Sequence, residues 1–163
     1  MEDDSDKFKI LFVCTGNICR SPTAEAILAL RLKGAGMGSE CEVDSAGIED
    51  WHAGSPPDER SVETAHYRGY DMSGLKARGI RRQDFADFDL IIGLDNRHVE
   101  TLKRRAPAAA AGKIKLLGEF GDGREVADPY HRERSAFDEV FDQIERYCNG
   151  LIIHLKKCLT ERD

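Results

Sequence analysis

Short apolar runs alternate along this chain with longer segments of helix-forming residues, and this alternation restricts its possible folds more than any other feature. Apolar runs of this length, bounded by turn residues, are typical of buried strands, whereas amphipathic stretches with a 3.6-residue period are typical of helices. Strands that alternate with helices form a mostly parallel sheet covered on both faces. We therefore predict a three-layer α/β fold, with a central four-stranded parallel sheet and helices on both faces.

The boundaries of these elements follow from glycine, proline and capping residues. Ser21 and Pro22 predict the start of the first helix, with Ser21 as the cap, and Ser135 with Asp138 predicts a capping box for the last one. The strands are predicted at residues 9–14, 41–46, 88–94 and 113–117. The helices are predicted at residues 22–33, 58–68 and 96–105 and from about 135 onward, with a small-residue linker at 106–112 and a mobile loop at 118–134.

Bulk properties exclude several classes of protein. The chain has 163 residues and a formal net charge of −6, which suits a single domain over residues 1–163 and argues against a nucleic-acid partner. Residues 1–7 are predicted to be a flexible tail. There is neither a signal peptide pattern nor an apolar run long enough for a membrane helix, so we expect a cytoplasmic protein that does not bind membranes. We also expect a monomer without a cofactor.

The turn after the first expected strand carries the residues with the most distinctive chemistry. Ligands of open parallel sheets bind beyond the carboxyl ends of the strands, and Cys14 lies at such an end. Gly16 and Asn17 tolerate the tight turn, and backbone N–H groups that run into a helix N-terminus bind phosphate oxygens. Arg20 adds a planar fork for two further oxygens. A cysteine and an arginine at this spacing also occur by chance in surface turns, but their position between a strand and a helix makes the pattern specific.

The same surroundings favour a reactive sulfur at Cys14. A helix N-terminus and a nearby guanidinium stabilise a thiolate, and the hydroxyl of Ser21 is placed to help. Cys19 is the second cysteine of this turn, but no further Cys or His pair has the spacing of zinc ligands, so we predict no metal site. An odd count of five cysteines in a chain without a secretion signal also does not indicate a disulfide scaffold.

The segment Val13-Cys14-Thr15-Gly16-Asn17-Ile18-Cys19-Arg20-Ser21-Pro22 resembles the signature of the low-molecular-weight protein tyrosine phosphatases. The likeness covers nearly the whole chain and includes Asp44-Ser45-Ala46-Gly47, Asp84-Phe85 and Asp128-Pro129-Tyr130. It implies the phosphotyrosine phosphatase I fold, which is Rossmann-like, and hydrolysis of phosphotyrosine proteins and small aryl phosphates through a cysteinyl phosphate.

The resemblance also implies roles for individual residues. Cys14 is the expected nucleophile, Arg20 the phosphate clamp, and Asp128 the general acid that later acts as the base. Trp51 and Tyr130 are the expected walls of the substrate pocket. The remaining residues of the phosphate-binding loop and its support are Thr15, Gly16, Asn17, Ile18, Cys19, Ser21 and Ser45. Similar enzymes form a reversible disulfide that protects the nucleophile, here Cys14–Cys19, which would make the protein redox-sensitive.

Three alternative functions remain to be weighed against this one. Arsenate reductases share the fold and loop but need two further cysteines, and residues 80–95 contain none. Protein-arginine phosphatases tend to carry threonine where Ile18 stands. A non-catalytic phosphotyrosine-binding module would lack the nucleophile or the acid, yet Cys14 and Asp128 are both present.

The chain departs from the common family pattern at three positions. Leu75 stands where many relatives have a histidine that braces the loop asparagine, so Asn17 has to be held by Ser45 or water. His131 replaces a second tyrosine, which removes one possible site of phosphorylation. Thr15 stands where leucine is common and is expected to alter the rim of the pocket.

Overall fold

Four short strands form one parallel sheet in the computed structural model, which describes residues 6–162. In sheet order they are β2 (Cys41–Gly47), β1 (Phe8–Cys14), β3 (Leu90–Gly93) and β4 (Ile114–Leu116). The four-stranded parallel sheet predicted from the sequence is therefore confirmed. Of the tail expected at residues 1–7, the first five residues lie outside the described part of the chain.

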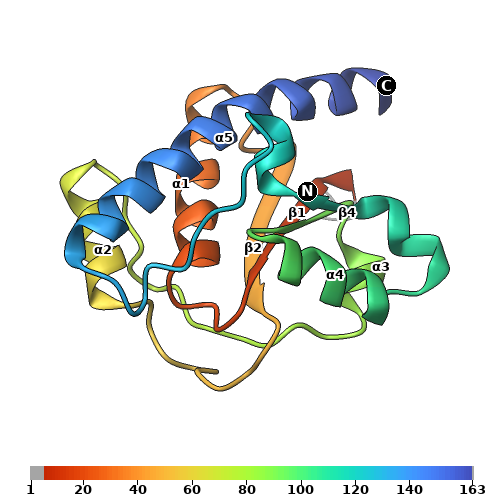
Figure 1. The fold of residues 1–163 in the computed structure, drawn as a ribbon. Helices are drawn as coiled ribbons and strands as arrows, with labels where there is room; N and C mark the ends of the chain where they lie inside the picture. Colours follow the sequence, from red (N-terminus) through yellow and green to blue (C-terminus); the bar gives the residue numbers. More distant parts are fainter. Residues whose placement is uncertain (1–5, 163) are drawn as a thin grey trace.

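Within residues 6–162, five α-helices lie in two layers on either side of this sheet (Figure 1). On one face lie α1 (Arg20–Gly34) and the long α5 (Arg134–Arg162), with α2 (Glu59–Tyr67) beside them. On the other face lie α3 (Asp84–Asp87) and α4 (Asn96–Arg105). Two 3₁₀ helices, η2 (Ala108–Lys113) and η3 (Leu117–Phe120), flank β4. No helix within residues 6–162 is long and apolar enough to cross a membrane.

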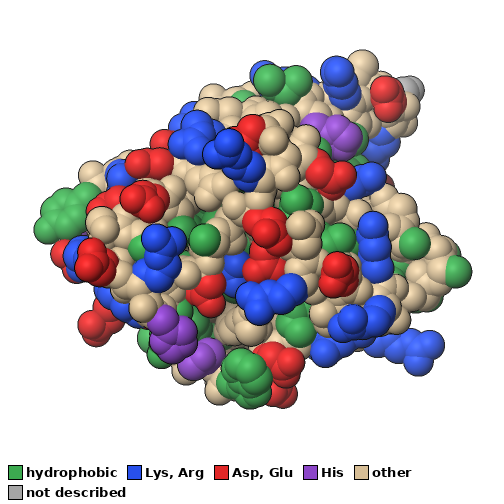
Figure 2. All heavy atoms as spheres, in the orientation of Figure 1, with side chains coloured by type: hydrophobic (Ala, Val, Ile, Leu, Met, Phe, Trp, Pro, Cys, Tyr) green, Lys and Arg blue, Asp and Glu red, His purple; other side chains and the backbone are tan. Residues whose placement is uncertain are grey.

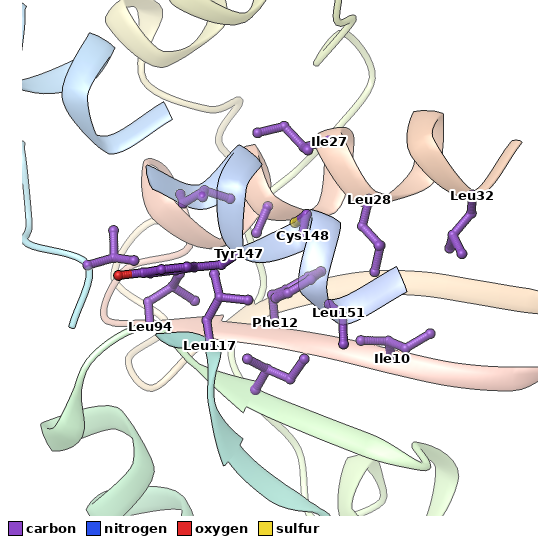
Figure 3. Packing of buried hydrophobic residues seen from close by; sticks show 14 of the residues in the cluster. Ile10, Phe12, Ile27, Leu28, Leu32, Leu94, Leu117, Tyr147, Cys148 and Leu151 are labelled. Atoms are coloured by element: carbon purple, nitrogen blue, oxygen red, sulfur yellow. The ribbon is translucent and has the colours of Figure 1, made fainter. Parts of the chain in front are cut away.

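The side chains of β1 alternate between the two faces and fill both cores, as the pleat of a strand requires. Ile10 and Phe12 point to the face of α1 and α5, where they pack among leucines and isoleucines of both helices (Figure 3). Leu11 and Val13 point to the other face and join a smaller cluster with Phe85. Because β1 is covered on both sides, its carboxyl end at Cys14 has a fixed position.

Several predicted boundaries are wrong in detail. The first helix begins at Arg20 after Cys19 at its N-cap, so Ser21 is not the cap, because its hydroxyl is engaged with the loop that precedes the helix. The last helix begins at Arg134, which places Ser135 inside the first turn and excludes the predicted capping box. The linker at residues 106–112 contains most of η2, and the loop at 118–134 contains most of η3.

The carboxyl ends of the strands meet at one edge of the sheet. In the strand register Cys14 lies opposite Gly47, and Val13 lies opposite Gly93. The loops that follow β1 and β2 therefore start side by side, and they run along the lower edge of the molecule in Figure 1. Histidine and hydrophobic side chains emerge at that edge in the space-filling view of Figure 2.

Candidate active site

The loop between β1 and α1 returns on itself within a few residues. Asn17 is the only non-glycine residue among residues 6–162 with positive φ, at 59°. Asparagine tolerates this left-handed conformation better than most residues. Beside it, Gly47 has no room for a side chain, because a Cβ there would approach the carbonyl oxygen of Thr15 to 2.9 Å. The turn at Asn17 and the close approach at Gly47 together let the loop wrap around one small volume.

The amide of Asn17 is held on all sides. Its Nδ2 donates to Ser21 Oγ at 2.8 Å and to Ser45 Oγ at 2.9 Å. Its Oδ1 accepts from the backbone N–H of Arg78 at 3.0 Å. Leu75, the position where the resemblance implied that a histidine is common, packs against the larger core. Ser45 is one of the two supports expected from the sequence, and the backbone of Arg78 is a support that the sequence did not reveal.

Cys14 is buried at the base of this loop, within reach of two donors from the start of α1. Its Sγ lies 2.9 Å from Ser21 Oγ and accepts from the backbone N–H of Ser21 at 3.4 Å. Ser21 Oγ accepts a hydrogen bond from Asn17 Nδ2, and its own proton has two acceptors within reach. The sulfur at 2.9 Å is much closer than the carbonyl oxygen of Ala46 at 3.5 Å, so the geometry favours donation to the sulfur. Two hydrogen-bond donors and the positive end of the helix dipole therefore converge on the sulfur of Cys14.

Arg20 is almost fully buried, with only 2% of the residue exposed, and it is anchored from one side. Its Nη1 donates to Asp95 Oδ2 at 2.8 Å and to the carbonyl oxygen of Val126 at 2.9 Å. Burial opposes the charge on Asp95, but hydrogen bonds from Arg20 and His98 outweigh it and hold the pKa of Asp95 below its ordinary value. Because Asp95 and Val126 occupy Nη1, the rest of the guanidinium is available to a bound anion.

A cavity of about 270 Å³ opens above the loop and brings together residues from three parts of the chain. Asp128 lies on its wall with 43% of the side chain exposed, and its Oδ2 is 3.8 Å from Arg20 Nη2. Asp128 Oδ1 accepts from the backbone N–H of Tyr130 at 3.1 Å, which forms a short turn and fixes the carboxylate. The cavity is lined by Cys14, Thr15, Gly16, Ile18, Cys19, Arg20, Trp51, His52, Asp128, Tyr130 and His131.

Two aromatic residues form the mouth of this cavity. Trp51 is 71% exposed, so its ring is not part of either core. Tyr130 is supported from below by Arg60, whose Cζ lies 5.5 Å from the ring centroid. Arg60 is in turn clamped by Asp58 through two side-chain hydrogen bonds, at 3.0 and 2.9 Å. The mouth therefore presents two flat apolar surfaces, the rings of Trp51 and Tyr130, and Arg60 supports the ring of Tyr130.

The site residues predicted from the sequence all come together. Cys14, Arg20, Asp128 and the aromatic pair line the cavity, while Asn17, Ser21 and Ser45 lie behind the loop. Sequence reasoning missed Asp95 and His98, which hold Arg20 and Thr15 from α4. Asp95 comes directly after the strand predicted at residues 88–94, at the sheet edge where ligands bind, and this signal could have placed it near the site although not against Arg20.

Cys19 lines the same cavity as Cys14, and both thiols are free. Burial, followed by repulsion from Asp58, raises the pKa of Cys19 to about 12. Cys19 is thus a neutral thiol, whereas nucleophilic attack requires a thiolate. Among residues 6–162, no three His, Cys, Asp or Glu side chains are grouped so that they could hold a metal ion.

Glu25 of α1 continues the support of Asn17, and it gives the protein a pH-dependent stability. Its Oε1 accepts from Ser45 Oγ at 2.6 Å, and burial raises its pKa from 4.5 to about 7. A raised carboxyl pKa stabilises the fold at low pH, and this contribution is lost as pH rises from about 4.5 to about 7. This loss corresponds to about 3 kcal/mol in the free energy of unfolding, and we expect Glu25→Gln to remove it.

Urea unfolding of the wild type and Glu25→Gln at pH 5 and pH 8 measures this effect. The free energy of unfolding of the wild type should fall from pH 5 to pH 8 by more than that of the variant, because glutamine cannot ionise. Glu139→Gln, at an exposed position of α5, is the matched control and should follow the wild type. A difference between wild type and Glu25→Gln that does not change with pH would contradict the assignment.

Comparison with known proteins places this geometry in one family. The family model described as low molecular weight phosphotyrosine protein phosphatase matches residues 9–161. The chain is 39% identical over 152 residues to low molecular weight phosphotyrosine protein phosphatase 2 of Drosophila melanogaster, covering 91% of this chain and 92% of that one. It is 38% identical over 151 residues to the low molecular weight protein-tyrosine-phosphatase YfkJ of Bacillus subtilis, covering 91% and 96%. A crystal structure of a protein tyrosine phosphatase from Entamoeba histolytica, with Hepes in its active site, superposes with a TM-score of 0.89 at 35% identity, covering 93% and 98%.

Proposed function

The chain belongs to the low molecular weight phosphotyrosine protein phosphatase family, and we propose that it hydrolyses phosphotyrosine in proteins through a cysteinyl phosphate on Cys14. The observation that carries the proposal is the convergence of Cys14, Arg20 and Asp128 on one cavity of about 270 Å³. A nucleophile, an anion clamp and a carboxyl group on one wall are the parts that displacement at phosphorus requires.

In the first step the thiolate of Cys14 attacks the phosphorus, and the bond from phosphorus to the tyrosine oxygen breaks. Arg20 and the backbone N–H groups of the loop hold the phosphoryl oxygens and stabilise the charge that spreads over them. Asp128, in its protonated form, gives its proton to the departing phenolate oxygen. The products of this step are free tyrosine hydroxyl, the cysteinyl phosphate and an Asp128 carboxylate.

In the second step a water molecule attacks the phosphorus of the cysteinyl phosphate. The Asp128 carboxylate takes a proton from this water, and the sulfur of Cys14 leaves as a thiolate. The hydroxyl and N–H of Ser21, both within hydrogen-bond distance of the sulfur, stabilise this leaving group. Inorganic phosphate then departs, and Asp128 is again protonated for the next cycle.

The walls of the cavity favour an aryl phosphate over other phosphate esters. Ile18 gives the wall an apolar side chain, where a guanidinium-type substrate would need a polar partner. Trp51 and Tyr130 offer rings against which a phenyl group can stack. These contacts support phosphotyrosine as the substrate, ahead of the phosphoarginine alternative. A role confined to binding is disfavoured by the presence of both Cys14 and Asp128 beside Arg20.

Phosphate release from matched peptides that carry phosphotyrosine, phosphoserine or phosphoarginine tests the proposed substrate. We expect kcat/KM for phosphotyrosine to exceed the other two by about 10- to 100-fold or more, since the alternatives lose the apolar contacts of the mouth. Trp51→Ala, at an exposed position that leaves the core intact, should reduce this preference. Faster phosphate release from the phosphoarginine peptide would show that phosphoarginine, and not phosphotyrosine, is the substrate. Release from none of the three peptides would contradict the proposed function.

A further inference from the structure

Thr15 and His98 form a partly buried pair that the mechanism above does not use. They lie 83 positions apart in the chain, yet Thr15 Oγ1 and His98 Nε2 are 3.0 Å apart. Building on the proposed function, we propose that Thr15 donates a hydrogen bond to the bound phosphoryl group and that His98 is a positioning residue which orients its hydroxyl. The position of the protons in this pair carries the inference.

One ring nitrogen of His98, Nδ1, faces the start of α4. The backbone N–H of Asp95 donates to His98 Nδ1 at 3.1 Å, and a backbone N–H can only donate. Nδ1 is also 3.3 Å from Asp95 Oδ1, but the hydrogen bond to this oxygen comes from the backbone N–H of His98 at 3.1 Å, and not from Nδ1. These contacts form a capping box at the start of α4. Nδ1 must therefore carry a lone pair.

The other ring nitrogen of His98, Nε2, carries the hydrogen. His98 is only 2% exposed, and burial together with the charge of Arg20 lowers its pKa to about 4, so the ring is neutral near pH 7. A neutral imidazole with a lone pair on Nδ1 has its hydrogen on Nε2. Nε2–H then donates to Thr15 Oγ1, and Thr15 is the acceptor in this hydrogen bond.

The hydroxyl proton of Thr15 is left for a ligand. A hydroxyl that accepts one hydrogen bond keeps its own proton for another partner. No other hydrogen bond of Thr15 Oγ1 occurs within residues 6–162, and Thr15 lines the cavity next to Cys14. The proton of Thr15 is thus available to an oxygen of a phosphoryl group bound above Cys14. A leucine at this position would supply no such donor.

The same tautomer has a second consequence, for Arg20. Its Nη2 lies 3.4 Å from His98 Nε2, but an Nε2 that carries hydrogen cannot accept from a guanidinium. Nη2 therefore keeps its hydrogens for the anion, while Nη1 is held by Asp95 and Val126. His98 acts in this way on two donors of the site without contacting the substrate.

Binding of inorganic phosphate to Thr15→Val, Thr15→Ser and the wild type tests the proposal without depending on turnover. Valine has the shape of threonine but no hydroxyl, and we expect it to weaken phosphate binding by about 10- to 100-fold, as for the loss of a hydrogen bond to a charged group. Serine keeps the hydroxyl and should restore most of the affinity. If the phosphotyrosine proposal fails but Thr15→Val still weakens phosphate binding, only the proposed substrate is wrong.

Nitrogen NMR of the ¹⁵N-histidine-labelled wild type provides a second test that needs no variant. We expect His98 to show the Nε2–H tautomer at pH 7, with the chemical shift of Nδ1 typical of a nitrogen without hydrogen. The Nδ1–H tautomer, or phosphate affinity in Thr15→Val equal to that of the wild type, would overturn the proposal.

Discussion

Cys14→Ser is expected to abolish the hydrolysis of p-nitrophenyl phosphate, with a fall in kcat of about 10⁴-fold or more, as for the loss of a catalytic nucleophile. A serine hydroxyl at this position is protonated at neutral pH, so neither hydrogen bonds from Ser21 nor the dipole of α1 can supply a reactive anion there. The donors of the loop and the clamp of Arg20 are unchanged in this variant. It should therefore still bind inorganic phosphate, which separates loss of chemistry from loss of the site.

Cys158→Ser is the matched control for this experiment. Cys158 is a half-buried cysteine near the end of α5, where its Sγ contacts His154, and it has no place in the cavity. Its replacement should leave kcat and KM near those of the wild type. Activity that persists in Cys14→Ser would refute the covalent mechanism, and loss of phosphate binding in that variant would point to collapse of the loop.

The fold could be predicted from the sequence because its signals are local and repeated. The apolar run that ends at Cys14 and the glycine-containing turn after it indicate a strand and its end without reference to the rest of the chain. The predicted strand at residues 88–94 was too long because its flanking apolar residues, Phe88 and Leu94, pack in the cores outside β3. Helix α3 escaped prediction because it has a single turn and no room for a hydrophobic period.

The core of the site was equally accessible, because Cys14, Asn17, Arg20 and Ser21 lie within one short segment. Among their supports Ser45 was also expected, but the contacts of Asp95 and Arg78 were not, because they depend on which parts of the chain are neighbours in the fold. Asp95 reaches Arg20 only because β3 lies next to β1 in the sheet, and strand order does not follow from residue periodicity. The backbone of Arg78 supports Asn17 for a similar reason, since its position depends on a long segment between α2 and α3.

The supports also show how this chain holds the asparagine of its loop with Leu75, and not a histidine, at residue 75. Asn17 is tied to β2 through Ser45, and Ser45 is tied to α1 through Glu25. The guanidinium of Arg78 is held by Asp44 at 3.0 Å and by Asp84 at 3.0 Å, so the peptide that donates to Asn17 is fixed as well. Supports from β2, from α1 and from the segment that carries Arg78 thus converge on Asn17, and a change in any of them acts on the same asparagine.

Asp128→Asn is expected to lower kcat for a phosphotyrosine peptide by about 10²–10⁴-fold, the usual contribution of a general acid or base. Asparagine keeps an oxygen for the hydrogen bond from the N–H of Tyr130, so the turn that positions residue 128 should persist. What it removes is the proton for the phenolate and the base for the attacking water. Steady-state kinetics on the peptide, with the wild type as reference, measures this loss.

p-Nitrophenyl phosphate separates the two roles of Asp128. Its leaving group is stable as an anion, so the first step needs little help from an acid, whereas hydrolysis of the cysteinyl phosphate still needs the base. Asp128→Asn should therefore release one equivalent of p-nitrophenolate in a fast burst, followed by slow turnover, and the cysteinyl phosphate should accumulate on Cys14. Glu133→Gln, at an exposed carboxylate of the same loop, should show neither the burst nor the loss. Full activity of Asp128→Asn on the phosphotyrosine peptide would assign the proton transfers to another group. Turnover of p-nitrophenyl phosphate at the wild-type rate, without a burst, would limit Asp128 to the first step.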